Sequence, residues 1–196
     1  MHRLEFLKAN IKPGTILDVG NLDKNGAIHA SLIKQFPTST FYGLDILDQK
    51  DLGVHFDNQK VGSFENIDYP ENTFDTIYIG EVIEHTWRPY DVIAACYKTL
   101  KPGGRLILDT PNVYSLSRMV RFFMTGMDII LGNAQHKIFF SPAMLDNLLK
   151  TAGFTVTKIE SEVNFDTRRL KCKLPNVGSF KMMGECLLVL AEKPAK

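Results

Sequence analysis

The feature that most constrains the fold is an alternation of short apolar runs with segments of helical periodicity. Apolar runs of strand length occupy residues 15–20, 40–46, 74–80 and 105–110. Apolar residues at helical spacing occupy residues 4–11, 27–36 and 90–100. A short apolar run without polar alternation is typical of a parallel strand that is buried on both faces. Strands that alternate with helices therefore predict a parallel sheet that is covered by helices on both faces.

The C-terminal part of the chain departs from this alternation. A helical pattern at residues 142–151 is followed by strand-like runs at 155–163 and 186–192, with no helical pattern between these runs. Two consecutive strands without a helical crossover predict an antiparallel hairpin at one edge of the sheet. The sequence therefore predicts an α/β fold with a doubly wound, mostly parallel sheet and an antiparallel edge hairpin. The length of 196 residues suits a single domain over residues 1–196.

The composition limits the classes of function. The net charge of +1 gives no overall attraction for nucleic acid. The three cysteines are far apart and form no CxxC pair, which indicates free thiols rather than a disulfide framework or a zinc site. The N-terminus lacks the apolar run of a signal peptide, and no apolar stretch is long enough to span a membrane. These features predict a cytoplasmic protein.

The residues at the predicted strand ends are candidate ligand contacts, because ligands of such sheets bind beyond the carboxyl ends of the strands. The first strand ends in Asp18-Val19-Gly20, and the second ends near Asp45. A glycine at this position lets the backbone turn and approach a ligand closely. A carboxylate after the second strand can accept hydrogen bonds from both ribose hydroxyls of a nucleoside. Each aspartate alone also has a structural interpretation, as a helix cap or a turn residue.

The loop that follows Gly20 is long for a nucleotide-binding turn. The next glycine is Gly26, and the sequence NLDKN separates the two. A bound pyrophosphate needs a compact glycine turn at a helix N-terminus, so this loop argues against a nicotinamide-dependent oxidoreductase. We expect Asn21 and the backbone around Gly26 to replace the usual glycine contacts.

Five motifs follow one another along the chain: ILDVG, FYGLDI, FDTIYIGEVIEH, LKPGGRLIL and HKIFFSPAMLDNLLKTAGF. Their order resembles that of the class I S-adenosylmethionine-dependent methyltransferases and covers most of residues 3–192. The resemblance implies a Rossmann-like sheet of seven strands and S-adenosyl-L-methionine as the cofactor. It places Asp18 and Gly20 by the methionine end of the cofactor and Asp45 at the ribose. It also places Gly80 and Glu81 on the floor of the cofactor site.

The resemblance further places Ser63 and Phe64 at the edge of the adenine. The chain departs from the family pattern at two positions. Leu22 stands where the family usually has a second glycine, and Ser63 stands where it usually has an acidic residue. A serine can still accept a hydrogen bond from the adenine amino group, but without the assistance of a charge.

Two glutamates and two histidines form the candidate catalytic set. If a helix begins at Glu81, then Glu84 and His85 share its face, and a later segment can bring His136 over them. Carboxylates and imidazoles at this spacing fit a divalent ion such as Mg²⁺. The pattern resembles ubiquinone-pathway O-methyltransferases and small-RNA 2′-O-methyltransferases, in which the matching residues are associated with a divalent ion.

Other interpretations of this set stay open. Without a metal, His85 or His136 is the candidate general base for a hydroxyl or an amine. In the structural interpretation, Glu84 pairs locally and His85 is an ordinary residue at the start of a helix.

The segment at residues 115–131 is apolar nearly all round, except for Arg118 and Arg121. One interpretation is a helix that packs on the sheet. Another is a lid, at about residues 112–136, over a hydrophobic substrate. A third is an interfacial helix whose arginines contact anionic lipid.

Together these features predict a methyltransferase that uses S-adenosyl-L-methionine to methylate an oxygen of a small-molecule or lipid-like acceptor. Peripheral membrane contact through residues 115–131 belongs to this prediction, and RNA is a further acceptor class that the sequence leaves open. The alternative is a non-catalytic binding subunit with a methyltransferase fold and a degenerate cofactor loop. The sequence gives no indication of the oligomeric state.

Overall fold

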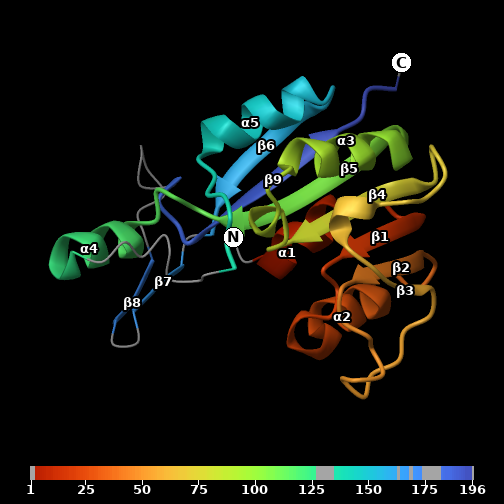
Figure 1. Ribbon diagram of the computed structural model, residues 1–196, viewed down its shortest axis with the longest axis horizontal. Helices are drawn as coiled ribbons and strands as arrows, with labels where there is room; N and C mark the ends of the chain where they lie inside the picture. Colours follow the sequence, from red (N-terminus) through yellow and green to blue (C-terminus); the bar gives the residue numbers. More distant parts are fainter. Residues whose placement is uncertain (1–2, 127–134, 163, 168–169, 174–181, 196) are drawn as a thin grey trace.

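A seven-stranded sheet forms the centre of the protein (Figure 1). The computed structural model describes residues 3–126, 135–162, 164–167, 170–173 and 182–195. In order across the sheet, the strands are β3 (Gln59–Val61), β2 (Thr40–Asp45), β1 (Thr15–Val19), β4 (Phe74–Gly80), β5 (Leu100–Pro111), β9 (Cys186–Glu192) and β6 (Thr155–Ser161). The strands from β3 to β5 are parallel, whereas β9 runs antiparallel to both β5 and β6. This arrangement confirms the predicted mostly parallel sheet with an antiparallel edge.

Helices cover both faces of the sheet (Figure 1). The helices α3 (Pro89–Thr99) and α5 (Pro142–Thr151) bury their apolar residues against one face, together with Leu17 and Val19 of β1. The helices α1 (Arg3–Asn10) and α2 (Ala27–Gln35) bury theirs against the other face, together with Ile16. Because neighbouring residues of β1 enter opposite cores, the strand needs apolar side chains on both faces, as the continuous apolar runs predict.

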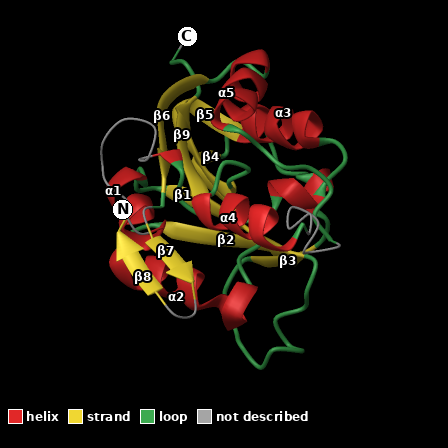
Figure 2. Cartoon of the chain, turned by 90° about the vertical axis from the view of Figure 1, so that its left-hand side faces the viewer, coloured by secondary structure: helices red, strands yellow, loops and turns green. Residues whose placement is uncertain are grey.

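Two parts of the β structure were not predicted from the sequence. The strand β3 is only three residues long, and its sequence QKV is largely polar, so it forms no apolar run. The strands β7 (Asn164–Thr167) and β8 (Leu170–Lys173) form a separate two-stranded sheet beside the main one (Figure 2). This hairpin lies in the chain between β6 and β9, where the sequence predicted no regular structure.

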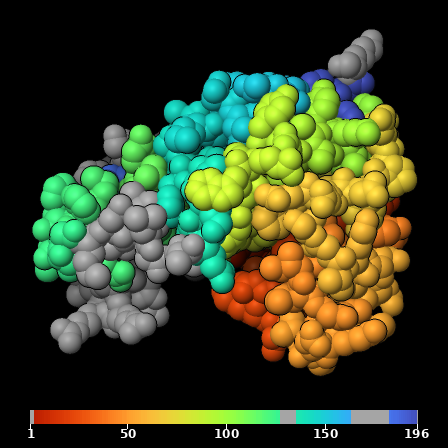
Figure 3. All heavy atoms as spheres, in the orientation of Figure 1, coloured from red at the N-terminus to blue at the C-terminus, as the bar shows by residue number. Residues whose placement is uncertain are grey.

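The helix α4 (Leu116–Thr125) extends away from the main sheet (Figures 1 and 3). None of its residues is buried, and Phe123 and Met124 are 79% and 80% exposed. The helix contacts β7. Because none of its residues is buried, the interpretation of the segment as a helix that packs on the sheet is wrong over residues 116–125. Residues 127–134 of the predicted lid lie outside the described residues.

Within the described part of the chain, no helix combines the length and the apolar character that are needed to cross a bilayer.

The loop between β1 and α2 contains a turn of left-handed backbone. The φ angles of Lys24, Asn25 and Gly26 are 50°, 58° and 73°. A residue other than glycine that adopts this conformation costs about 1–2 kcal/mol, and asparagine tolerates it better than most. The chain thus passes from β1 to α2 through a strained turn in place of a run of glycines.

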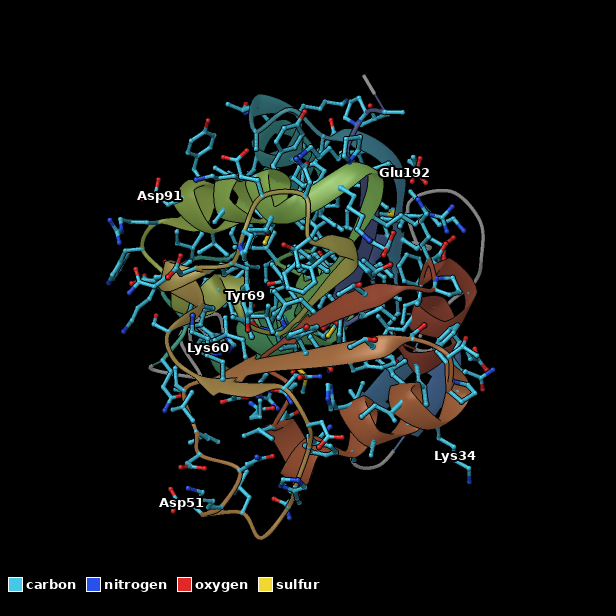
Figure 4. The ribbon with its side chains drawn as sticks, turned by 90° about the vertical axis from the view of Figure 1, so that its right-hand side faces the viewer. Lys34, Asp51, Lys60, Tyr69, Asp91 and Glu192 are labelled. Carbon is cyan, nitrogen blue, oxygen red and sulfur yellow. The ribbon has the colours of Figure 1, made fainter. Side chains whose placement is uncertain are left out.

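We expect Lys24→Gly to raise the free energy of unfolding by about 0.5–1 kcal/mol, because glycine removes the left-handed strain but has more freedom in the unfolded chain. Urea unfolding of both proteins measures the difference. Lys34→Gly is the matched control, since Lys34 projects from the right-handed helix α2 (Figure 4). This control should instead lose about 1 kcal/mol. Equal losses in the two variants would contradict the strain at Lys24.

Candidate active site

A cavity lies at the point where the strand order of the sheet reverses. The chain proceeds from β1 to β2 on one side and from β4 to β5 on the other. The loops beyond the carboxyl ends of β1 and β4 therefore diverge and leave a crevice for a ligand. The cavity measures about 920 Å³, which falls within the usual range of ligand sites, about 300–1,000 Å³. Gly20, Asp45, Gly80 and Pro111 line it from the ends of β1, β2, β4 and β5.

One half of the cavity is formed by the ends of β1 and β2. Gly20 has a φ of 77°, and a Cβ atom at this position would lie only 2.3 Å from Cγ2 of Val82. The carboxylate of Asp45 accepts hydrogen bonds from the backbone N–H groups of Leu22, at 2.9 Å, and Leu47, at 3.0 Å. These bonds fix the loop after β1 against the end of β2. The same wall continues through Ile46, Leu47, Gly62 and Phe64.

Asp18 and Asn21 lie behind this wall rather than on it. Asp18 is buried, and its carboxylate accepts a hydrogen bond from Nδ1 of His29 at 2.8 Å. The amide of Asn21 exchanges two hydrogen bonds with the amide of Gln59. Asp18 and Asn21 line a small space of about 10 Å³, which is close to the volume that one water molecule needs. Their side chains shape the loop after β1 and do not line the 920 Å³ cavity.

Gly26 and Ser63 also have contacts within the protein. Gly26 is buried at the start of α2, and a Cβ atom there would lie 2.5 Å from the ring of Phe56. The hydroxyl of Ser63 accepts a hydrogen bond from the backbone N–H of Glu65 at 3.2 Å. Neither residue lines the cavity, although Phe64, the neighbour of Ser63, does.

A buried charged network holds Glu81 at the end of β4. Glu81 has a φ of 50°, and its carboxylate accepts a hydrogen bond from the guanidinium of Arg3. The same guanidinium lies 3.1 Å from a carboxylate oxygen of Asp109, whose other oxygen accepts a hydrogen bond from the hydroxyl of Tyr78 at 2.6 Å. The thiol of Cys186 also donates to Glu81, at 3.4 Å. The network joins α1, β4, β5 and β9 beneath the cavity.

As a whole, this network carries no local sequence signal, because its members lie far apart in the chain. Arg3 and Glu81 are separated by 78 positions. Asp109 did carry a signal, since it is an acidic residue in the apolar strand RLILDT, and a buried charge needs a partner. Burial raises the pKa of Asp109 to about 7, against the opposite effects of Arg3 and Tyr78.

This raised pKa predicts a pH dependence of stability. Between the ordinary value of 3.8 and about 7, the folded protein keeps a proton that the unfolded chain releases. Stability is therefore greatest below the lower value and falls as the pH rises through this window. We expect wild type to lose roughly 1 kcal/mol per pH unit relative to Asp109→Asn across the window, measured by urea unfolding. Asp57→Asn is the control, because the Asp57 side chain is 93% exposed. The difference in unfolding free energy between wild type and Asp57→Asn should not change with pH.

The other half of the cavity contains Glu84, His85 and His136. Glu84 is 1% exposed, and its Oε2 accepts a hydrogen bond from the hydroxyl of Thr110 at 3.0 Å. Its Oε1 is buried and has no hydrogen-bond partner among the described residues. Burial raises the pKa of Glu84 to about 7. The unpartnered oxygen is therefore available to a proton donor or a metal ion.

Backbone hydrogen bonds bring the two histidines together. The carbonyl of Glu84 accepts from the N–H groups of Lys137, at 2.7 Å, and Ile138, at 3.2 Å, so this segment folds back over the cavity. Nδ1 of His85 donates to the carbonyl of Gln135 at 3.1 Å, which leaves Nε2 of a neutral His85 as the acceptor. The ring centroids of His85 and His136 are 4.9 Å apart. Burial and the charges of His85 and Arg118 lower the pKa of His136, so its ring is neutral at neutral pH.

The predicted helix that begins at Glu81 is absent. Glu84 and His85 instead belong to a short 3-10 turn, Ile83–His85. Glu81 precedes this turn with a left-handed backbone, and its carboxylate is held by Arg3. The prediction that Glu81 shares a helical face with Glu84 and His85 is therefore wrong, because the ion pair with Arg3 and the positive φ fix Glu81 separately.

The remaining members of the predicted metal set do come together. One donor atom each from Glu84, His85 and His136 lies within 4.8 Å of the other two. One carboxylate and two imidazoles are a donor set that suits a divalent ion. The unpartnered Oε1 of Glu84 makes this set chemically suitable for such an ion.

Comparisons with known proteins agree with this geometry. The chain matches the family described as methyltransferase domain over residues 2–159. It is 28% identical to the ubiquinone biosynthesis O-methyltransferase of Pseudomonas paraeruginosa over 166 residues, which cover 78% of this chain and 69% of the relative. It is 33% identical to a Mycolicibacterium smegmatis protein named "Probable S-adenosylmethionine-dependent methyltransferase" over 95 residues, which cover 48% of this chain and only 34% of that relative.

A solved structure supports the fold. The crystal structure of an S-adenosylmethionine-dependent methyltransferase from Archaeoglobus fulgidus superposes with a TM-score of 0.69 at 20% identity, and covers 97% of this chain and 94% of that one. The two proteins thus share a fold. At 20% identity, the similarity does not indicate which methyl acceptor this chain uses. Since the family match extends over most of the sequence and the fold agrees with it, the chain belongs to the methyltransferase-domain family of S-adenosylmethionine-dependent methyltransferases.

Proposed function

We propose that the protein methylates a hydroxyl oxygen of a small-molecule or lipid-like acceptor, with S-adenosyl-L-methionine as the methyl donor. The observation that carries the proposal is the group of Glu84, His85 and His136 in the same cavity as Gly20 and Asp45. A hydroxyl must lose its proton as it attacks, and this group offers proton acceptors within the cavity. The similarity to ubiquinone biosynthesis O-methyltransferases supports oxygen as the acceptor atom.

The cofactor half fits a nucleoside with an amino-acid end. Asp45 can accept hydrogen bonds from the ribose hydroxyls through the lone pairs that Leu22 and Leu47 leave unused. Ile46 and Phe64 offer apolar surface to the adenine. The absence of a side chain at Gly20 leaves room beside the backbone for the methionine end.

The acceptor half orients the hydroxyl and removes its proton. Nε2 of His85 is the proton acceptor, because its Nδ1 donates to the carbonyl of Gln135. The low pKa of His136 makes it the second candidate base. Glu84, held by Thr110, fixes the position of the group. If a divalent ion such as Mg²⁺ binds to Glu84, His85 and His136, it would lower the pKa of an acceptor hydroxyl bound to it.

We propose that residues 112–136 cover the acceptor end, as a lid within one domain that spans the chain. Arg118 of α4 and Gln135, near the other end of this segment, both line the cavity, which supports the proposal. Phe122, Phe123 and Met124 of α4 are exposed. Exposed apolar residues on a helix with arginines support peripheral contact with a membrane that supplies a lipid-like acceptor.

Calorimetric titration with S-adenosylhomocysteine tests the cofactor half, and methyl transfer to hydroxylated aromatics, glycans, lipids and RNA ends tests the acceptor half. Micromolar binding together with transfer to oxygen is expected. NADH is the control ligand and should not bind. If neither ligand binds, the non-catalytic subunit becomes the better account. Transfer to nitrogen alone would contradict an oxygen acceptor.

A further inference from the structure

Arg118 lines the acceptor end of the cavity, and its Nε–H has no hydrogen-bond partner among the described residues. Arg118 lies in the first turn of α4 and lines the cavity, and its side chain is 22% exposed. Its Nε atom is buried and donates no hydrogen bond to any described residue. The nearest carboxylate, that of Glu185, lies 3.9 Å away, which is too far for a hydrogen bond. The carboxylate of Glu185 instead accepts a hydrogen bond from Ser117.

Lys137 adds a second cation at the same end of the cavity. It lines the cavity and is exposed, and its ammonium lies 5.9 Å from the centroid of the exposed Trp87 ring. Among the described residues, no carboxylate forms an ion pair with it. The position of Lys137 is fixed by the backbone bond from its N–H to the carbonyl of Glu84.

The acidic residues at this end do not balance these two cations. Glu81 lines the cavity, but its charge is matched by Arg3. Glu84 is buried and bound to Thr110, so its carboxylate is committed to the group with the two histidines. Among the described residues, the acceptor end therefore presents Lys137 without an ion pair and Arg118 with one loose ion pair to Glu185 and an Nε–H that donates no hydrogen bond.

We propose that Arg118 and Lys137 bind an anionic group, a carboxylate or a phosphate, on the methyl acceptor. This inference rests on the proposed function, because it takes this end of the cavity as the acceptor site. The planar guanidinium of arginine donates parallel hydrogen bonds to carboxylate and phosphate oxygens, and lysine adds a point charge. The partial burial of Arg118 protects its attraction for an anion from screening by salt. The pair thus selects acidic acceptors over neutral ones and holds their hydroxyl near His85.

Inorganic phosphate is the first probe. Protein labelled with ¹⁵N and saturated with S-adenosylhomocysteine is titrated with phosphate, and the Nε–H signal of Arg118 is assigned by its loss in Arg118→Gln. A saturable shift of this signal is expected, with the dissociation constant raised about tenfold in Lys137→Gln. Arg121→Gln is the matched control, because Arg121 is exposed on the same helix and does not line the cavity. It should leave the dissociation constant unchanged.

The outcomes separate this inference from the proposed function. If S-adenosylhomocysteine binds but the Arg118 signal does not respond to phosphate, or responds no more than the Arg121 signal, the anion site is overturned and the proposed function stands. If S-adenosylhomocysteine itself does not bind, the proposed function fails first.

Membrane lipid is the other source of a phosphate group. Vesicles of phosphatidylcholine with and without phosphatidylglycerol distinguish it from a soluble acceptor. A response of the Arg118 signal to phosphatidylglycerol vesicles alone, with none to inorganic phosphate, would overturn the assignment to the acceptor. In the acceptor panel, carboxylated members should have a lower KM than their neutral counterparts. Arg118→Gln should raise that KM about tenfold or more, and should raise KM more for carboxylated members than for neutral ones.

Discussion

Replacing Gly20 with alanine is expected to weaken S-adenosylhomocysteine binding by about 10- to 100-fold. The added Cβ atom would lie 2.3 Å from Cγ2 of Val82 and 3.4 Å from the carbonyl oxygen of Gly80. Val82 is buried and branched at Cβ, so it cannot rotate away without disturbing its neighbours. The loop after β1 must shift instead, and this shift moves the cavity wall on which the cofactor depends. Calorimetric titration of both proteins measures the loss.

Gly53→Ala separates this effect from backbone strain. Gly53 has a φ of 65°, close to the 77° of Gly20, but no atom lies within 4 Å of its added Cβ. Both variants should therefore lose about 1–2 kcal/mol of stability through the left-handed conformation. Only Gly20→Ala should lose affinity for S-adenosylhomocysteine. Unchanged affinity in Gly20→Ala would show that the loop does not form the cofactor wall.

Replacing His85 with alanine is expected to lower kcat for methyl transfer by about 10²- to 10⁴-fold, the usual contribution of a general base. Binding of S-adenosylhomocysteine should not change, because His85 lies in the proposed acceptor half, whereas Asp45 is the proposed ribose contact. The best acceptor of the panel is used for the rate measurement. His55→Ala is the control, since the His55 side chain is 83% exposed and does not line the cavity. A rate within a few-fold of wild type in His85→Ala would remove it from the mechanism.

A metal titration decides which role His85 has. Mn²⁺ binding is followed by paramagnetic resonance, which does not depend on turnover. If the ion binds to Glu84, His85 and His136, then His85→Ala and His136→Ala should each weaken Mn²⁺ binding about 10- to 100-fold, and a chelator should lower the rate in wild type. If Mn²⁺ does not bind and the chelator has no effect, His85 acts as a base on its own.

Local sequence patterns predicted the elements whose side chains enter the two cores. The strand β1 has buried apolar residues on both faces, and its continuous apolar run in the sequence predicts this burial. The predicted strand ends therefore include Gly20 and Asp45, which line the cavity in the structure. The strand β3 was not predicted, because Gln59, Lys60 and Val61 form no apolar run and pair only with β2.

The details of the site depend on contacts between distant parts of the chain, which local patterns do not contain. Glu81 is the first residue of a possible helix in the sequence, but Arg3, 78 positions earlier in the chain, holds its carboxylate. Asn21 and Gly26 are predicted to replace glycine contacts, and the structure adds contacts that the sequence does not contain: the amide of Gln59 binds that of Asn21, and the ring of Phe56 lies against Gly26. In both cases the partner lies on an element that approaches only in the folded chain.

The position of β9 has a consequence for the order of folding. The last strand of the chain lies between β5 and β6, and Arg105 pairs with a residue 87 positions later. Contacts of such long sequence separation form late, because the closure of a long loop comes first. The crevice between β1 and β4 needs only earlier strands, and none of the residues that line the cavity lies on β9. Cys186 of β9 and the adjacent Glu185 instead contact two lining residues, Glu81 and Arg118. The crevice is therefore expected to form before β9 fixes the side chains of Glu81 and Arg118.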